Sequence, residues 1–170
     1  MLGVTYEREN CSAARALEIV GERWSLLIIR EALFARSTRF SQFQRNLGLA
    51  PNTLSSRLDR FLETGIMRTQ PVADQHETRE YVLTHKGLDL LPVVVALTKW
   101  GDRWAAPAGP PIIYKHAGCG GQVHQLLRCE NCGAELAPTQ VTTGTGPGSL
   151  PGELGSQSTT GPGQAPARRP

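Results

Sequence analysis

The chain lacks any apolar run long enough to cross a bilayer, and its first ten residues, MLGVTYEREN, lack the apolar core of a signal peptide. We therefore expect a cytoplasmic protein with no membrane partner. Cysteine is also scarce, with 4 in 170 residues. In a reducing compartment, such cysteines predict metal or redox chemistry rather than structural disulfides.

Acidic residues are nearly missing from one stretch of the chain. The whole sequence has 18 Lys and Arg against 15 Asp and Glu, so its net charge of +3 is weak support for a polyanionic partner. Residues 36–60, however, contain a single acid, Asp59. The basic residues of this stretch are five arginines: Arg36, Arg39, Arg45, Arg57 and Arg60. This concentration of positive charge favours contact with nucleic acid.

The same stretch predicts a helix-turn-helix over residues 40–65. Ser41 followed by Gln44 is typical of a capping box at the start of the first helix. Gly48 permits the turn, Pro51 suits the first position of the second helix, and Gly65 suits a left-handed cap at its end.

The second predicted helix has two chemically different sides. Its apolar residues recur at helical spacing: Leu54, Leu58, Phe61 and Leu62. The opposite side carries Asn52, Thr53, Ser56, Arg60 and Glu63, with Arg57 at the margin. Asn and Arg can pair with base edges, and Ser and Thr with phosphates, so we predict a DNA-reading helix, with Arg39 and Ser41 as further DNA contacts. An ordinary solvated helix face is the alternative.

The segments around this unit predict a winged helix. Residues 25–34 read as a central apolar helix with Ser25 as its N-cap. Two short strands follow Gly65 and enclose a polar tip, which predicts a hairpin wing whose DNA contacts are Arg68, His76 and Arg79. A hairpin that only covers the core is the alternative.

A long helix is predicted from His85 to Trp104, with Thr84 as its cap and a kink or break at Pro92. Its apolar surface is broader than one side of so small a domain needs, which predicts a partner subunit. A twofold dimer would place two reading helices at half-sites about one DNA turn apart.

Cys11 directly precedes the first predicted helix. The positive end of the helix dipole, with Arg15 one turn on, would favour its thiolate. A reactive, redox-sensing role and a packed or capping role both remain open.

From Cys11 to Trp104 the chain resembles the HxlR-type transcriptional regulators, winged-helix proteins related to the MarR group. The segments that carry the resemblance are CSAARALEIVGERWSLLIIREAL, TRFSQFQRNL, LSSRLDRFLETGIM and EYVLTHKGLDLLPVVVALTKWG. The resemblance implies a homodimer joined by the first and last helices, with the 51–64 helix in the major groove. Several members of the family sense oxidants or electrophiles at the cysteine matched by Cys11.

The C-terminal extension contains His116-x2-Cys119 and Cys129-x2-Cys132. This spacing is typical of zinc knuckles, and four N or S ligands complete a tetrahedral zinc site. A segment this short cannot build its own core, so zinc binding would supply the folding energy. His124 is a rival fourth ligand; a redox Cys pair and a metal-free packing module are the other interpretations.

These observations predict a mainly α fold with a small β-hairpin wing and a small zinc-ribbon-like module. The predicted parts are an N-terminal arm (1–10), a winged-helix domain (11–105), a linker (106–111), the zinc module (112–141) and a disordered tail (142–170). We expect a non-enzymatic, homodimeric DNA-binding transcription regulator, a repressor, responsive to an oxidant or small-molecule effector and holding one structural zinc per chain. A thiol oxidoreductase or metal-binding adaptor using Cys129 and Cys132 is the alternative.

Overall fold

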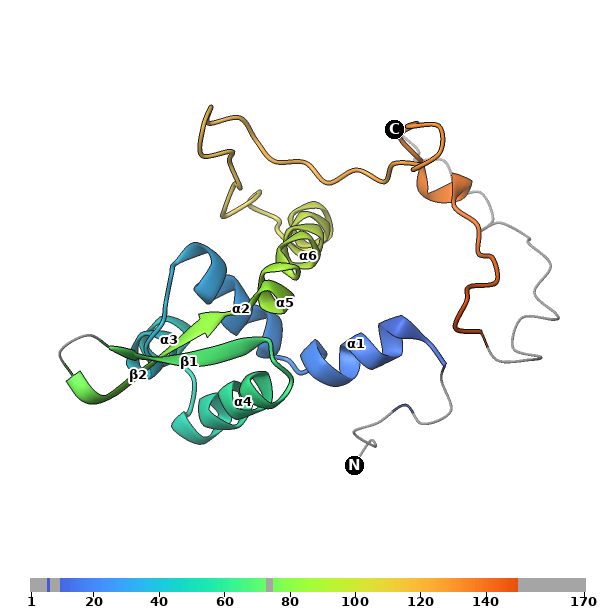
Figure 1. Ribbon diagram of the computed structural model, residues 1–170. Coiled ribbons are helices and arrows are strands. Elements are labelled where there is room, and N and C mark those ends of the chain that lie inside the picture. The colour runs from blue at the N-terminus through green and yellow to red at the C-terminus, as the bar shows by residue number, and fades with distance from the viewer. Residues whose placement is uncertain (1–5, 7–9, 73–74, 150–170) are drawn as a thin grey trace. The chain divides into compact units, whose positions relative to one another are not determined.

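The structure, a computed structural model, describes residues 6, 10–72 and 75–149, with the backbone alone for residues 72 and 75–78. The chain divides into two compact units, residues 1–123 and 124–170. The described elements are α1 (Ser12–Val20), α2 (Ser25–Phe34), α3 (Phe40–Leu47), α4 (Pro51–Glu63), β1 (Met67–Val72), β2 (Gln75–Leu83), α5 (His85–Leu88), α6 (Leu91–Trp104) and a short 3-10 turn, Pro138–Gln140 (Figure 1). No helix among the described residues is long and apolar enough to cross a membrane.

The core of the first unit forms where α2, α3 and α4 meet the hairpin. Ile28 and Ile29 of α2 are fully buried, which confirms that this apolar helix is central. Further buried side chains of this core come from α3, α4, β1 and α6, among them Phe43, Leu54, Leu58, Phe61, Met67 and Val94. Burial of the α4 residues fixes the rotation of that helix, because a single apolar side must face the core.

The helix-turn-helix is confirmed. Gly48 ends α3 with φ of 64°, in the left-handed region where glycine carries no Cβ penalty. Pro51 is the first residue of α4, and Gly65 follows the helix with φ of 71°. Both helix ends therefore follow the turn chemistry of the sequence.

Two predicted helix starts are wrong by one or two residues. The first residue of α3 is Phe40 and its N-cap residue is Arg39; Gln42 Oε1, in the first turn, accepts the backbone N–H groups of Thr38 and Arg39 at 2.9 Å. Ser41 therefore lies inside the helix. Ser25 does not cap α2 either, because its N–H donates to Glu22 O at 2.9 Å and the helix has already begun. Its hydroxyl is buried and has no hydrogen-bond partner within the described part of the chain.

The hairpin has the predicted antiparallel strands and projects from the helices as a wing (Figure 1). Met67 pairs with Leu83, and the register continues to Pro71 opposite Arg79. Strand β2 begins at Gln75, so pairing extends into the segment that the sequence predicts as a polar tip. The Tyr81 N–H also donates to Thr38 O at 2.7 Å, which attaches β2 to the connector before α3.

The predicted break near Pro92 is confirmed. Helix α5 ends at Leu88 and α6 begins at Leu91, so Pro92 lies in the first turn of α6, where no backbone donor is lost. Thr84 caps α5 as predicted, since its Oγ1 accepts the Gly87 N–H at 3.3 Å. The same hydroxyl donates to Gly65 O at 2.6 Å and so joins the end of α4 to the start of α5.

Candidate nucleic-acid interface

The polar side of α4 is accessible to solvent. Asn52 and Ser56 are exposed, Thr53 is half-buried, and the Arg60 side chain is 42 % exposed. Because Leu54 and Leu58 anchor the opposite side of the helix in the core, these polar groups point away from it. The structure thus leaves the predicted reading surface open to a ligand.

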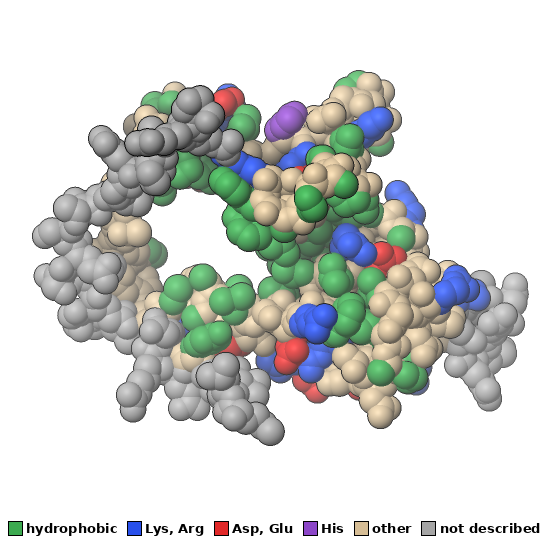
Figure 2. Space-filling model, turned by 180° about the vertical axis from the view of Figure 1, so that it is seen from behind, with side chains coloured by type: hydrophobic (Ala, Val, Ile, Leu, Met, Phe, Trp, Pro, Cys, Tyr) green, Lys and Arg blue, Asp and Glu red, His purple; other side chains and the backbone are tan. Residues whose placement is uncertain are grey.

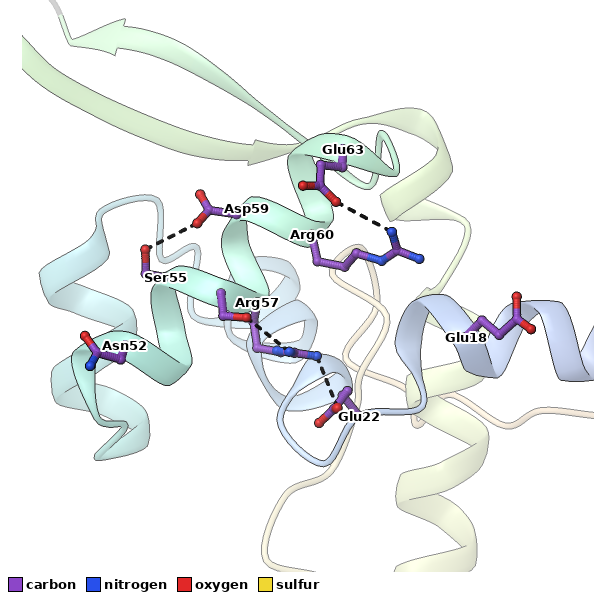
Figure 3. A pocket seen from close by; sticks show the side chains of 9 residues that line it. Glu18, Glu22, Asn52, Ser55, Arg57, Asp59, Arg60 and Glu63 are labelled. Atoms are coloured by element: carbon purple, nitrogen blue, oxygen red, sulfur yellow. Dashed lines mark hydrogen bonds and ion pairs between the residues drawn. The ribbon is translucent and has the colours of Figure 1, made fainter. Parts of the chain in front are cut away.

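A hollow of about 810 Å³ runs along this side of α4 (Figure 3). Its lining combines the polar residues of α4 with two glutamates from α1 and from the turn that follows α1. The residues are Glu18, Glu22, Asn52, Ser55, Ser56, Arg57, Asp59, Arg60 and Glu63. Four acids against two arginines make the lining acidic on balance, although residues 36–60 by themselves are basic.

Both arginines of the hollow already have carboxylate partners. Arg57 Nη1 lies 3.5 Å from Glu22 Oε1, and Arg60 Nη1 lies 3.5 Å from Glu63 Oε2 (Figure 3). The glutamates are about two-thirds exposed, at 63 % and 66 %. Such pairs are each worth roughly 0–1 kcal/mol, so a phosphate could replace either carboxylate at small cost.

The connector before α3 is held by Glu80 of β2. Gln70 Nε2 donates to its Oε2 at 3.2 Å, Thr38 Oγ1 donates to its Oε1 at 3.1 Å, and Arg39 Nε lies 3.7 Å away. The hydrogen bonds from Gln70 and Thr38, with the charge of Arg39, lower the pKa of Glu80 below its ordinary value of 4.5. Arg39 is half-exposed and Ser41 on α3 is exposed, so both keep access to solvent.

The wing does not bring its predicted contacts onto one face. Arg68 pairs with Val82, whereas Arg79 pairs with Pro71, three positions from Arg68 along β1. Because side chains alternate across a strand, the two exposed arginines lie on opposite faces of the hairpin. The side chain of His76, the third predicted wing contact, lies outside the described residues.

Cys11 is exposed and occupies the N-cap position of α1, as predicted. Its backbone is extended, with φ of −127°, and its side chain makes no capping hydrogen bond to the helix. Arg15 is turned toward Asn10, with Nη2 2.9 Å from Asn10 Oδ1. The Cys11 thiol is therefore exposed, and the Arg15 guanidinium is bonded to Asn10 instead.

The predicted metal ligands are present as two pairs, one in each unit. His116 Nδ1 lies 3.1 Å from Cys119 Sγ. Backbone N–H groups of Cys132 and Asn131, together with the Cys132 side chain, lower the pKa of the Cys129 thiol. Among the described residues, no three His, Cys, Asp or Glu side chains form a group that could hold a metal ion.

Three acidic residues at this interface were missed by the sequence analysis. Glu18 and Glu22 line the hollow beside α4, and Glu80 holds the connector. Glu22 lies 35 positions before its partner Arg57, and Glu80 lies 42 positions after Thr38. No local pattern marks such pairs, because only the packing of distant elements brings them together.

Comparison with known proteins gives a consistent result. The HxlR-like helix-turn-helix family profile matches residues 19–109. The uncharacterised HTH-type transcriptional regulator Rv3095 of Mycobacterium tuberculosis is 44 % identical over 146 residues, covering 85 % of this chain and 92 % of its own. The regulator YvaP of Bacillus subtilis is 32 % identical over 95 residues, covering 55 % of this chain and 87 % of its own.

Two solved structures resemble the fold over most of the chain. PA1607, a candidate transcription factor, superposes with a TM-score of 0.73 at 36 % identity, covering 81 % of this chain and 96 % of its own. PA1374, a candidate transcription factor from Pseudomonas aeruginosa, gives 0.59 at 36 % identity, with coverages of 83 % and 96 %. The similarity therefore extends beyond the helix-turn-helix itself.

Proposed function

The chain belongs to the HxlR-like helix-turn-helix family, and we propose that it is a homodimeric, sequence-specific DNA-binding repressor of transcription. It is a winged-helix transcription regulator, and DNA is the partner that this family membership implies. The observation that carries the proposal is the exposed polar side of α4, anchored by a fully buried apolar side. We propose that it acts in the cytoplasm and has no catalytic activity.

We assign the reading of bases to the N-terminal half of α4. Asn52 and Ser56 are exposed there, and the Ser56 hydroxyl accepts a hydrogen bond from Arg57 Nη2 at 3.2 Å. Arg57 and Arg60 lie further along the helix and would exchange their carboxylates for phosphates. Further contacts to the DNA backbone would come from Arg39, Ser41, Thr53 and one face of the wing.

The division of labour can be tested with two variants. Asn52→Ala should relax sequence preference, because Asn pairs bidentately with adenine. Arg60→Ala should weaken binding to all sequences and reduce the salt slope by about one unit, because a phosphate contact is lost. Fluorescence anisotropy with the DNA upstream of its own gene and with a scrambled duplex measures both quantities. Equal loss of site discrimination in the two variants would refute the assignment.

Dimerisation is supported by apolar side chains that the described chain leaves uncovered. On α6, Leu97, Trp100 and Trp104 are 52 %, 61 % and 59 % exposed, and Leu17 on α1 is 52 % exposed. Figure 2 shows hydrophobic side chains gathered in patches on one face of the molecule. Patches of this kind mark interaction surfaces, and a second copy would cover them symmetrically.

Trp100→Glu tests this surface. A buried, unpaired carboxylate would oppose the contact, so we expect the variant to sediment as a monomer while wild type sediments as a dimer. Gln125→Glu adds a carboxylate at an exposed residue outside α1 and α6, and this control variant should remain a dimer. A monomeric wild type would refute the dimer.

We further propose that Cys11 makes the regulator responsive to oxidants. Its exposure and its place at the N-cap of α1 support access for a reagent. A mild oxidant should release operator DNA from the wild type and leave Cys11→Ser bound. Release of both proteins alike would refute the role of Cys11 and leave DNA binding itself untouched.

A further inference from the structure

Two hairpins in the C-terminal extension have the same backbone geometry. In residues 114–123, the first knuckle, the His116 N–H donates to Gly121 O at 2.8 Å and the Gly120 N–H donates to His116 O at 2.8 Å. In residues 127–136, the second knuckle, the Cys129 N–H donates to Ala134 O and the Gly133 N–H donates to Cys129 O, both at 2.9 Å. The second knuckle thus repeats the hydrogen bonds of the first, position by position.

The strand pairs around these loops repeat as well. The first knuckle has the antiparallel bridge Lys115–Gln122, and the second has Arg128–Glu135. One step further out, the Val123 N–H donates to Tyr114 O at 2.9 Å, and the Leu136 N–H donates to Leu127 O at 2.8 Å. Two short segments with different sequences therefore fold into one type of tight hairpin.

Both knuckles place a ligand pair at the same point of the loop. His116 and Cys119 occupy the positions that Cys129 and Cys132 occupy in the second knuckle, and a glycine follows each pair. Gly120 and Gly133 both have φ of 72°, in the left-handed region that side chains with a Cβ rarely adopt. The left-handed residue closes the loop, so the two side chains of each pair project from the same short turn.

The side chains of the first knuckle are arranged to meet a cation. His116 Nδ1 and Cys119 Sγ are 3.1 Å apart, and bond lengths of about 2.0 and 2.3 Å to a tetrahedral zinc imply a separation of roughly 3.6 Å. A Cβ at Gly118 would lie 3.1 Å from the His116 ring, so this glycine makes room for the imidazole.

We propose that the two knuckles together bind one Zn²⁺ through His116, Cys119, Cys129 and Cys132. One knuckle supplies only two ligands, whereas structural zinc takes four N or S ligands. The nine residues between Cys119 and Cys129 can span up to about 30 Å, so the connection permits both pairs to reach one ion. Binding deprotonates three thiols and releases three protons to solvent, while the imidazole binds in its neutral form.

The first knuckle begins from a fixed point in the first unit. Tyr114 is buried, its ring stacks on Phe34 with centroids 4.4 Å apart, and its hydroxyl lies 3.2 Å from Thr98 Oγ1. Two residues later the chain reaches His116. This anchor holds one half of the proposed ligand set in place before metal arrives, and the ion would supply the remaining folding energy of the extension.

Metal content of the full chain tests the proposal independently of DNA binding. Protein purified under reducing conditions without chelator should contain one zinc per chain by plasma mass spectrometry. Cys119→Ser and Cys129→Ser should each lose most of this zinc, and Cys11→Ser should keep it. Wild-type protein that contains no zinc, and that takes up none from added zinc chloride, would overturn the proposal.

The fourth ligand is tested by a matched pair of histidine variants. His116→Ala should lose zinc, whereas His124→Ala should retain it; the reverse result would overturn the assignment to His116. Cobalt substitution gives a second readout, because three thiolates in a tetrahedral site produce intense visible bands and a sulfur-to-metal charge-transfer band. Circular dichroism checks that each variant keeps its helices, so that lost metal is not lost fold. A chain that holds a Cys129–Cys132 disulfide as purified, and that still takes up no zinc once this disulfide is reduced, would overturn the proposal in favour of a redox pair.

Discussion

Replacing Glu22 by glutamine should strengthen DNA binding. Glu22 Oε1 lies 3.5 Å from Arg57 Nη1 on the side of α4 that we assign to DNA. DNA must displace this carboxylate before a phosphate can take its place, and the carboxylate then repels the phosphate. A glutamine side chain keeps the size of glutamate and removes both effects.

The magnitude follows from the exposure of the pair. Glu22 is 63 % exposed and Arg57 is 22 % exposed, so the attraction is strongly screened by solvent and is worth roughly 0–1 kcal/mol. Affinity should therefore rise by up to about fivefold, since about 1.4 kcal/mol is tenfold. The gain should shrink at higher salt, because ions screen exposed charges.

Anisotropy titrations at two or more salt concentrations measure this change. Glu130→Gln is the control for the loss of one negative charge, because Glu130 is exposed and lies outside the winged helix; it should leave DNA affinity nearly unchanged. A double-mutant cycle isolates the pair: in an Arg57→Ala background, Glu22→Gln should lose most of its effect. Weaker binding by Glu22→Gln, or the same gain with and without Arg57, would contradict the exchange of partners at this arginine.

Two further predictions concern stability. Gly87→Ala should lower the free energy of unfolding in urea by about 1–3 kcal/mol, because a Cβ there would collide with the Ile66 carbonyl oxygen. Gly101→Ala, the control, has open space around its Cβ and should gain up to about 1 kcal/mol from helix propensity; equal effects of the two variants would show that the close approach at Gly87 is unimportant. Because folding lowers the pKa of Glu80, its carboxylate stabilises the fold above pH 4.5, and this stability is lost as pH falls through the pKa of the folded state. Glu80→Gln should therefore be less stable than wild type at pH 7, and the difference should shrink below pH 4.5. Urea unfolding midpoints measured across this pH range check the trend.

The sequence alone determined the helix-turn-helix, the wing and the break in the last helix. Apolar spacing fixed the side of α4 that faces the core. Gly48 marked the end of α3, and Pro51 and Gly65 marked the two ends of α4, because these residues have strong local conformational preferences. The helix starts at Ser41 and Ser25 were misplaced. Several polar residues near a helix start compete for the same backbone donors, and at α3 the Gln42 side chain accepts them rather than Ser41 or Gln44.

Only the tertiary structure decided what surrounds the reading side of α4. The sequence shows a basic stretch, but folding places Glu18 and Glu22 along the same hollow as Arg57, and it puts the two wing arginines on opposite faces. The structure also shows that residues 114–123 and 127–136, which differ in sequence, form the same type of knuckle. A local sequence pattern reports which backbone conformation a segment prefers and which of its side chains are buried. The charges around a side chain come from residues that are distant in the sequence and approach only when the elements pack, so no local pattern predicts them.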